Sequence, residues 1–131
     1  MSEAICYSLL FADRVIREDN GKTGIIGSFS QFNFPSFPAP ITFPWVVFFA
    51  IANLRGKHTI SMNLVHDDTQ SVVFPISMEI DAPGDVNLEI TIPAPIIILP
   101  KPGDYSLTLN VDGFPLCSRI LKVSKVDVLN G

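Results

Sequence analysis

Strict alternation of apolar and polar residues, interrupted by turn-forming pairs, is the sequence feature that most limits how this chain can fold. In residues 86–92 and 104–111 every second side chain is apolar, and the side chains between them are polar or small. Alternate side chains of a β-strand point to opposite faces, so each segment is predicted to be a strand that buries one face. Residues 58–66 and 71–80 follow a similar pattern, and no window keeps a helical stripe.

Glycine-containing pairs mark the reversals between these segments. Asn20-Gly21 and Asp112-Gly113 are typical of type I′ hairpin turns, in which both central residues need a positive φ. Pro83-Gly84 and Pro102-Gly103 indicate two further reversals. The runs between turns predict an all-β protein, an antiparallel β-sandwich of about eight strands that is immunoglobulin-like or C2-like. The predicted strands cover residues 4–17, 23–33, 42–53, 58–66, 71–80, 86–98, 104–112 and 115–125.

Composition limits the class of protein further. The chain has 131 residues, 47% of them hydrophobic and 17% charged, which is too apolar for intrinsic disorder and predicts a single sandwich domain over residues 1–131. A net charge of −4 disfavours nucleic-acid binding, and the most apolar region is too short to span a membrane. The N-terminal residues include Glu3 and lack a basic start, so we read no secretory signal and expect a cytoplasmic protein.

The two cysteines, Cys6 and Cys117, lie near opposite ends of the sequence. They could form a disulfide that ties the two ends together, or they could be two small buried hydrophobic residues in a reducing cytosol. Because we expect a cytoplasmic protein, the second interpretation is favoured. Two cysteines without CxxC spacing do not predict a zinc site.

Two segments depart from the half-buried pattern, because apolar side chains occupy both of their faces. One is residues 42–52, and the other is residues 93–99. A strand of a sandwich buries only one face against the core, so something is expected to cover the second face. A loop, the other end of the chain or another subunit could do so.

Aromatic residues are concentrated in one part of the chain. Seven of the ten phenylalanines and the only tryptophan lie between positions 29 and 49. These rings could build the core or line an interface, because aromatic side chains are enriched in both. Strand residues such as Phe43 and Trp45 favour the core, whereas Phe34 and Phe37, each followed by proline in a loop, are harder to bury. The candidate interface residues are Phe34, Phe37, Trp45 and Phe48.

Several short motifs together resemble a known family. They are Ala12-Asp13, Asn20-Gly21-Lys22, Ile26-Gly27-Ser28-Phe29, Phe34-Pro35, Phe37-Pro38, Pro102-Gly103-Asp104-Tyr105 and Asp112-Gly113. In this combination they resemble a family of small bacterial β-sandwich domains of unknown function, and the resemblance covers most of the chain. It implies a β-sandwich fold. It implies no site residues, because no catalytic residues are known for that family.

Few residues offer catalytic chemistry. The loop His66-Asp67-Asp68 could hold a metal ion, but aspartates are common in solvated turns because they bond to their own backbone, so a plain turn is favoured. The chain has no Gly-x-Ser-x-Gly motif and no phosphate-binding P-loop, and Gly24-Ile25-Ile26-Gly27 lacks the third glycine of a dinucleotide site. We therefore expect no catalytic residues, no metal site and no cofactor.

Three functions stay open at this stage. The favoured one is a non-enzymatic protein-binding or assembly module that associates with itself or with another protein, and not with nucleic acid or a membrane. A small-molecule or carbohydrate-binding sandwich domain would need an exposed ring, such as that of Trp45, on which a sugar can stack. A metal-dependent enzyme would need a loop site near His66, with His58, Asp67 and Asp68 as further candidates. The lack of catalytic motifs favours the binding module over an enzyme.

Overall fold

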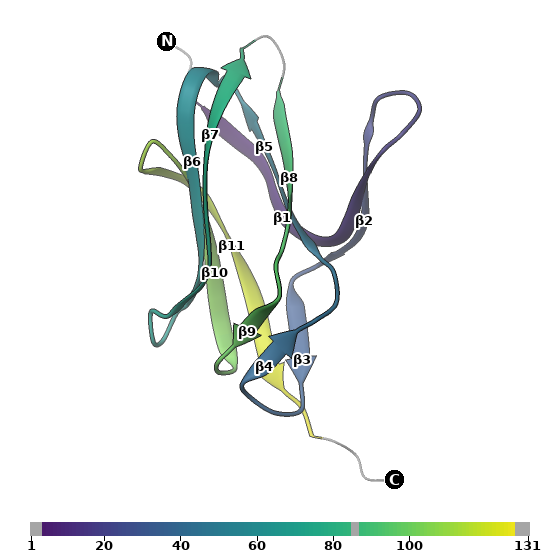
Figure 1. The fold of residues 1–131 in the computed structure, drawn as a ribbon, viewed down its shortest axis with the longest axis vertical. Helices are drawn as coiled ribbons and strands as arrows, with labels where there is room; N and C mark the ends of the chain where they lie inside the picture. The colour runs from purple at the N-terminus through teal and green to yellow at the C-terminus, as the bar shows by residue number, and fades with distance from the viewer. Residues whose placement is uncertain (1–3, 85–86, 128–131) are drawn as a thin grey trace.

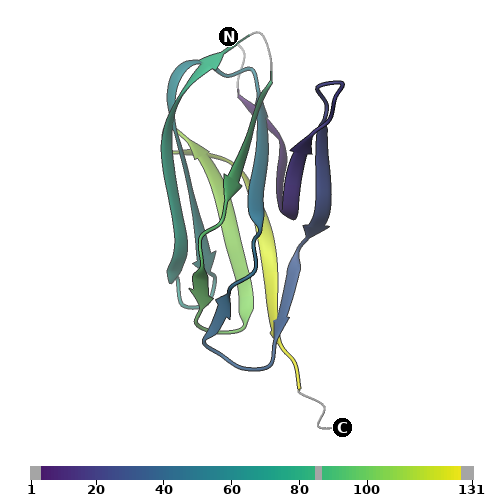
Figure 2. The same cartoon turned by 45° about the vertical axis from the view of Figure 1, so that its right-hand side comes forward.

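The computed structural model describes residues 4–84 and 87–127, which fold into two packed β-sheets and a small ribbon (Figures 1 and 2). The prediction of an all-β sandwich is confirmed. The four-stranded sheet has the order β2 (Thr23–Phe29), β1 (Ile5–Arg17), β5 (Val46–Ala52) and β8 (Leu88–Pro93). The five-stranded sheet has the order β3 (Gln31–Phe34), β11 (Phe114–Lys125), β10 (Gly103–Val111), β6 (Arg55–His66) and β7 (Val72–Pro83). The ribbon pairs β4 (Ala39–Ile41) with β9 (Ile97–Leu99).

The alternation in the sequence determines which side chains form the core. In the centre of the five-stranded sheet, Leu64 of β6 lies opposite Leu107 of β10, and Met62 lies opposite Leu109. All four side chains are fully buried, while the residues between them are exposed or partly exposed. Burying a side chain of this size stabilises a fold by roughly 1.5–3 kcal/mol. Within the described ranges, the structure has no helix long and apolar enough to cross a membrane.

The strands are shorter and more numerous than predicted, because some predicted segments break. The segment 23–33 divides at Ser30, where the chain leaves β1 as a partner and joins β11 in the other sheet. The segment 86–98 divides at residues 94–96, and β9 then pairs with β4, a three-residue strand that the sequence pattern does not predict. The β3–β11 pair is parallel, so the expectation of purely antiparallel pairing is wrong at this edge.

Tyr105 links the start of β10 to the preceding loop. Its side chain is fully buried, and its hydroxyl donates a hydrogen bond of 2.6 Å to the backbone carbonyl of Lys101. A buried tyrosine that bonds back to the backbone a few residues upstream is the tyrosine corner of immunoglobulin-like sandwiches. Of the two sandwich types that the sequence leaves open, the structure therefore favours the immunoglobulin-like one.

The two cysteines form a disulfide that joins the two sheets. Cys6 lies in β1 and Cys117 in β11, and their Cα atoms are 6.4 Å apart. The expectation of two unbonded thiols is therefore wrong. That expectation rests on the compartment alone. The bond forms because β1 and β11 meet at one side of the sandwich, and a single sequence does not reveal which strands meet.

The β1–β2 hairpin forms an arm that turns away from the sheet and runs beside it (Figures 1 and 2). Thr23 of the arm donates a hydrogen bond of 2.5 Å to Glu89 on the outer face of β8. Phe48, on the outer face of β5, is only 5% exposed and lines the hollow between arm and sheet together with Val15 and Ile16. The second apolar face of residues 42–52 is thus covered within the chain itself.

Candidate binding surfaces

The β4–β9 ribbon exposes apolar side chains that nothing in the described part of the chain covers. Ile96 is 73% exposed and Ile98 is 59% exposed, whereas the alternating residues Ile97 and Leu99 are buried in the core. Pro40 of β4 lies opposite Ile98 and is exposed as well. We call the exposed residues Pro40, Pro95, Ile96 and Ile98 the ribbon face. The second two-faced segment, residues 93–99, therefore keeps an open outer face.

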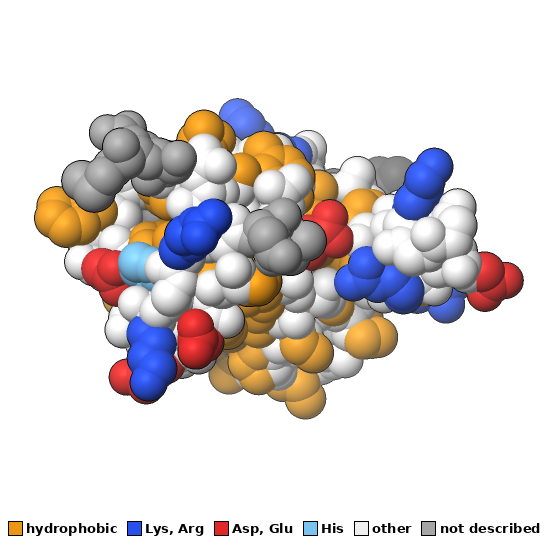
Figure 3. Space-filling view, turned by 90° about the horizontal axis from the view of Figure 1, so that it is seen from above, with side chains coloured by type: hydrophobic (Ala, Val, Ile, Leu, Met, Phe, Trp, Pro, Cys, Tyr) orange, Lys and Arg blue, Asp and Glu red, His pale blue; other side chains and the backbone are white. Residues whose placement is uncertain are grey.

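The space-filling view from above places this surface in context. In Figure 3, hydrophobic side chains gather along the lower side of the molecule, which is the side that faces the reader in Figure 1. Elements β8 and β9 lie on that side. Charged side chains lie on the lobe at the right of Figure 3, which is formed by the β1–β2 arm, and in a second group at the left of the view. The apolar surface and the charged arm are therefore separate.

The four candidate interface residues differ in their exposure. Trp45 is 1% exposed and Phe48 is 5% exposed, so neither ring is available at the surface. Phe34 and Phe37 are partly buried and pack edge-to-face, with ring centroids 6.1 Å apart and an interplanar angle of 80°. Phe43, for which the sequence favours the core, is 44% exposed and its ring rests against Phe32. Binding through Phe34 and Phe37 stays a prediction.

Trp45 is a core residue. Its ring contacts those of Phe11, Phe32 and Phe74, with centroid distances of 5.9, 6.0 and 6.1 Å. A ring enclosed on these sides offers no surface on which a sugar can stack. The carbohydrate-binding hypothesis therefore loses the residue on which it depended.

His66 is buried and has hydrogen-bond partners at both ring nitrogens. Nε2 lies 2.9 Å from the carbonyl oxygen of Pro102, and Nδ1 lies 2.8 Å from Oγ1 of Thr69. The carbonyl can only accept, so Nε2 carries the proton and Nδ1 accepts bonds from Thr69. Asp67 and Asp68 are exposed, and the hydrogen-bond partners of the ring are Thr69 and Pro102 instead. His66 thus links the turn after β6 to the loop that precedes β10.

No metal-binding cluster is found in the part of the chain that the structure describes. Within residues 4–84 and 87–127, no three His, Cys, Asp or Glu side chains lie close enough together to hold an ion. The metal-dependent hypothesis named His58, His66, Asp67 and Asp68, and the structure separates His58 from the other three. His58 lies near the start of β6, and His66 ends that strand.

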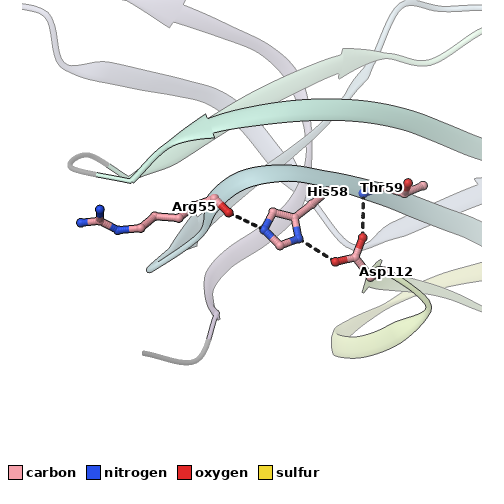
Figure 4. A network of polar contacts seen from close by, with 4 residues as sticks. All are labelled: Arg55, His58, Thr59 and Asp112. Carbon is pink, nitrogen blue, oxygen red and sulfur yellow. Dashed lines mark hydrogen bonds and ion pairs between the residues drawn. The ribbon is translucent and has the colours of Figure 1, made fainter. Parts of the chain in front are cut away.

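His58 instead pairs with the β10–β11 turn (Figure 4). Its Nδ1 lies 2.6 Å from Oδ2 of Asp112, and its Nε2 lies 2.6 Å from the carbonyl oxygen of Arg55. Oδ1 of Asp112 accepts a hydrogen bond of 2.9 Å from the backbone N–H of Thr59. The Asp112–Gly113 turn has positive φ at both residues, 51° and 84°, which confirms the type I′ turn and aims the carboxylate at His58.

This network favours a charged His58. Both ring nitrogens face acceptors, and a ring can donate to two acceptors only as an imidazolium. The hydrogen bond to Asp112 and the one to the Arg55 carbonyl raise the pKa of His58 above its ordinary value of 6.5. The hydrogen bond from His58 lowers the pKa of Asp112 below 3.8. Both nitrogens are engaged in these hydrogen bonds, so neither is free to accept a proton from a substrate. The pair therefore links β6 to the β10–β11 turn.

Two surface hollows flank His58. One, of about 390 Å³, includes the charged residues Lys57, Glu79 and Asp81 in its lining. The other, of about 580 Å³, is lined partly by apolar residues, among them Leu54 and Phe114. The sequence names His58 only as a further candidate for a metal site. It does not predict the pair, because Asp112 lies 54 residues away and is typical of a turn.

The fold and its surfaces define a β-sandwich that carries an apolar ribbon left uncovered by the described residues. Residues 7–124 match the family described as "Family of unknown function (DUF6941)", and the chain belongs to that family. The expectation of a family of unknown function is thereby confirmed. The matched region includes most of β1 and most of β11, the two strands that carry the cysteines. No curated protein matches the chain.

Proposed function

We propose that this chain is a non-enzymatic assembly module, which associates with a second copy of itself through the ribbon face. The observation that carries the proposal is the exposure of Ile96 and Ile98, at 73% and 59%, on a regular two-stranded ribbon. Removing apolar surface from water is favourable by roughly 25 cal/mol per Å². A contiguous exposed apolar patch is a common mark of an interaction site.

The absence of charge on the ribbon face is compatible with a second copy as the occupant. The chain carries a net charge of −4, so two copies repel each other at long range. The ribbon face contains only proline and isoleucine, so two such faces can meet without like charges opposite one another. Pro40 and Pro95 lack backbone N–H groups, which disfavours pairing through strand edges and favours packing through side chains. The same patch on both copies would give a closed two-fold dimer.

The absolute mass in solution tests this proposal. Light scattering over a hundredfold range of concentration should give a mass that rises from 14.4 kDa towards twice that value. The double variant Ile96→Lys/Ile98→Lys should stay at the monomer mass. Ile120→Lys is the matched control, because Ile120 is 46% exposed on β11, away from the ribbon, and this variant should associate like the unmodified protein. A monomer at every concentration, or a double variant that still dimerises, would overturn the proposal.

A further inference from the structure

The Cys6–Cys117 disulfide lies on a side of the sandwich where both sheets end. Strand β2 pairs with β1 only over residues 11–17, so residues 5–10 of β1 pair with β5 alone. Strand β3 pairs with β11 only over residues 122–125, so the part of β11 that carries Cys117 pairs with β10 alone. In the described part of the chain, the bond therefore bridges two strand edges that have no further partner on this side.

A surface hollow of about 290 Å³ opens at this bond. Both cysteines line the hollow, and both are partly exposed. The other lining residues belong to the same two strands, and one of them, Arg119, is charged. Exposed disulfides exchange with thiols more readily than enclosed ones, and a hollow of this size has room for a small thiol.

A bulge in β1 and the alternation of β11 turn the two cysteines towards each other. The register between β1 and β5 shifts between Cys6 and Ser8, so Cys6 lies opposite the buried residue Ile51. In β11, Cys117 lies opposite Leu109, which is buried as well. Opposite residues of an antiparallel pair share one face of the sheet, so both cysteines face the space between the sheets.

Arg119 projects from the same face of β11 as Cys117. It lies opposite Leu107, which is fully buried. Ser118, which separates the two, bonds instead to the hydroxyl of Thr108 at 2.8 Å on the outer face. Side chains two residues apart on a strand point to the same side. The guanidinium is thus the cation of this hollow, and it forms no ion pair with the residues that the structure describes.

We propose that this hollow is a site of thiol–disulfide exchange, at which a small anionic thiol reduces the Cys6–Cys117 bond in the folded protein. The guanidinium of Arg119 attracts a negatively charged thiol and repels a positively charged one. It also stabilises a thiolate on Cys117, because a cation beside a cysteine favours the ionised form. This inference concerns a different surface from the ribbon face, so it does not depend on self-association.

The exchange takes place in two steps. The thiolate of the first reductant molecule attacks Sγ of Cys6, the S–S bond breaks, and its electron pair leaves on Cys117 as a thiolate beside Arg119. A second thiol then attacks the sulfur of the bound reductant, forms a disulfide with it and releases Cys6 as a thiolate. In total, two thiols lose two electrons and two protons, and the protein disulfide takes them up as two cysteine thiols.

Two small thiols of opposite charge test the proposal. The anionic probe is mercaptoethanesulfonate and the cationic probe is cysteamine, and alkylation of the released cysteines followed by mass spectrometry gives the rate of reduction. Arg119→Gln should lower the ratio of the anionic to the cationic rate by about threefold or more, because it removes the charge that distinguishes the probes. Taking the ratio cancels the intrinsic reactivity of each thiol.

Lys122→Gln is the matched control for charge. Lys122 is exposed on β11, and its neighbours Leu121 and Val123 are buried, so it projects from the opposite face to Arg119. This variant should keep the ratio of the unmodified protein. A ratio that is the same in Arg119→Gln as in the unmodified protein would overturn the proposal.

Urea distinguishes exchange in the folded protein from exchange after unfolding. Below the unfolding transition, the rate of reduction should scarcely depend on urea, whereas a bond reached only by global unfolding would be reduced faster as the unfolded fraction rises. Acid quenching early in the reaction should trap the anionic probe on Cys6, where peptide mass spectrometry detects it. A rate that rises with the unfolded fraction, or a probe trapped chiefly on Cys117, would contradict the proposed exchange.

Discussion

The carboxylate of Asp13 lies directly against the backbone of Gly27, where the β1–β2 arm leaves the sheet. Gly27 has a φ of 68°, and a β-carbon at this position would overlap the Asp13 side chain. The flanking pairs Ala12–Ser28 and Arg14–Ile26 stay in register, so the irregularity is confined to this point. Both residues belong to the motifs that carry the family resemblance, and the contact gives a physical reason for this aspartate and this glycine.

Gly27→Ala should destabilise the protein. The alanine would have to adopt a positive φ, and its methyl group would displace the Asp13 carboxylate. Strain of this kind costs on the order of 1–3 kcal/mol. Urea denaturation followed by circular dichroism would measure the free energy of unfolding.

The comparison with Gly21→Ala separates backbone strain from crowding. Gly21 has a φ of 83°, but a β-carbon there would meet nothing within 4 Å. Gly21→Ala should therefore cost less than Gly27→Ala, and Asp13→Ala should recover part of the loss caused by Gly27→Ala. Equal losses at the two glycines, together with no coupling to Asp13, would contradict this account.

Removal of the Cys6–Cys117 disulfide should lower stability substantially. The bond closes a loop with a sequence separation of 111 residues. Closing a loop of this size restricts the unfolded chain and contributes up to roughly 4–5 kcal/mol, although many measured values are smaller. The double variant Cys6→Ser/Cys117→Ser and the reduced protein should lose similar free energies of unfolding in chemical denaturation.

Thiol titration of the denatured protein checks the bond itself. The disulfide predicts no reactive thiol before reduction and two after it. Disulfides persist mainly in oxidising compartments, so the bond and the expected cytoplasmic location oppose each other. Two reactive thiols in freshly purified, unreduced protein would favour the cytosol and would remove the stabilisation predicted here.

The His58–Asp112 pair should make stability depend on pH. The raised pKa of His58 stabilises the fold fully below its ordinary value of 6.5, and this contribution is lost as the pH rises through the raised pKa. The lowered pKa of Asp112 stabilises the fold above 3.8, and this contribution is lost as the pH falls through the lowered pKa. The pair therefore contributes most between pH 3.8 and 6.5.

His58→Gln should flatten this dependence on the alkaline side. In the unmodified protein, the free energy of unfolding should fall as the pH rises above 6.5, and in the variant this fall should be smaller. Asp112→Asn should behave in the same way, because it removes the carboxylate charge that faces Nδ1 and favours the imidazolium. Both measurements need only denaturation curves at a series of pH values. Parallel curves for the three proteins would show that the pair does not control the pH dependence.

Tyr105→Phe should test the tyrosine corner. The variant keeps the buried ring and removes the hydroxyl that bonds to the Lys101 carbonyl at 2.6 Å. An acceptor that loses its partner in a partly buried site costs roughly 1–3 kcal/mol. Tyr7→Phe is the matched control, since Tyr7 is 48% exposed, and its melting temperature should scarcely change. A similar melting temperature for both variants would argue against a structural role of the corner.

The fluorescence of Trp45 should show that its ring is shielded from solvent in the core. It is the only tryptophan, and it is 1% exposed. Its Nε1 is buried without a hydrogen-bond partner among the described residues, so a strongly blue-shifted emission is expected. Acrylamide should quench it poorly. Emission near that of free tryptophan would mean that the ring is open to solvent and would restore it as a possible stacking surface.

The sequence predicts the regular part of the fold well, because alternation is a local property. Strands β6, β10 and β11 lie close to their predicted bounds, and Asp112-Gly113 adopts the expected turn. Asn20-Gly21 does not, since only Gly21 has a positive φ and its N–H bonds to the Glu18 carbonyl at 2.8 Å. The break at Ser30 escapes prediction as well, because a strand that changes sheets keeps its alternation.

The candidate surfaces are less predictable, because they depend on what covers each strand. Phe48 and Ile98 lie in segments with the same two-faced apolar pattern, but only Phe48 is covered, by the β1–β2 arm. The His58–Asp112 contact likewise joins a strand to a distant turn. No local pattern distinguishes these outcomes, because each is decided by tertiary packing.

The Cys6–Cys117 bond also determines how the protein would respond to mechanical force. A pull on the residues before Cys6 and after Cys117 would first load residues 118–125 of β11, which lie outside the bridged loop, and would then pass through the covalent bond. The strands between the two cysteines would carry almost no tension, so they would stay folded under loads that unravel an unbridged domain. Reduction would expose this enclosed part of the chain to the same force.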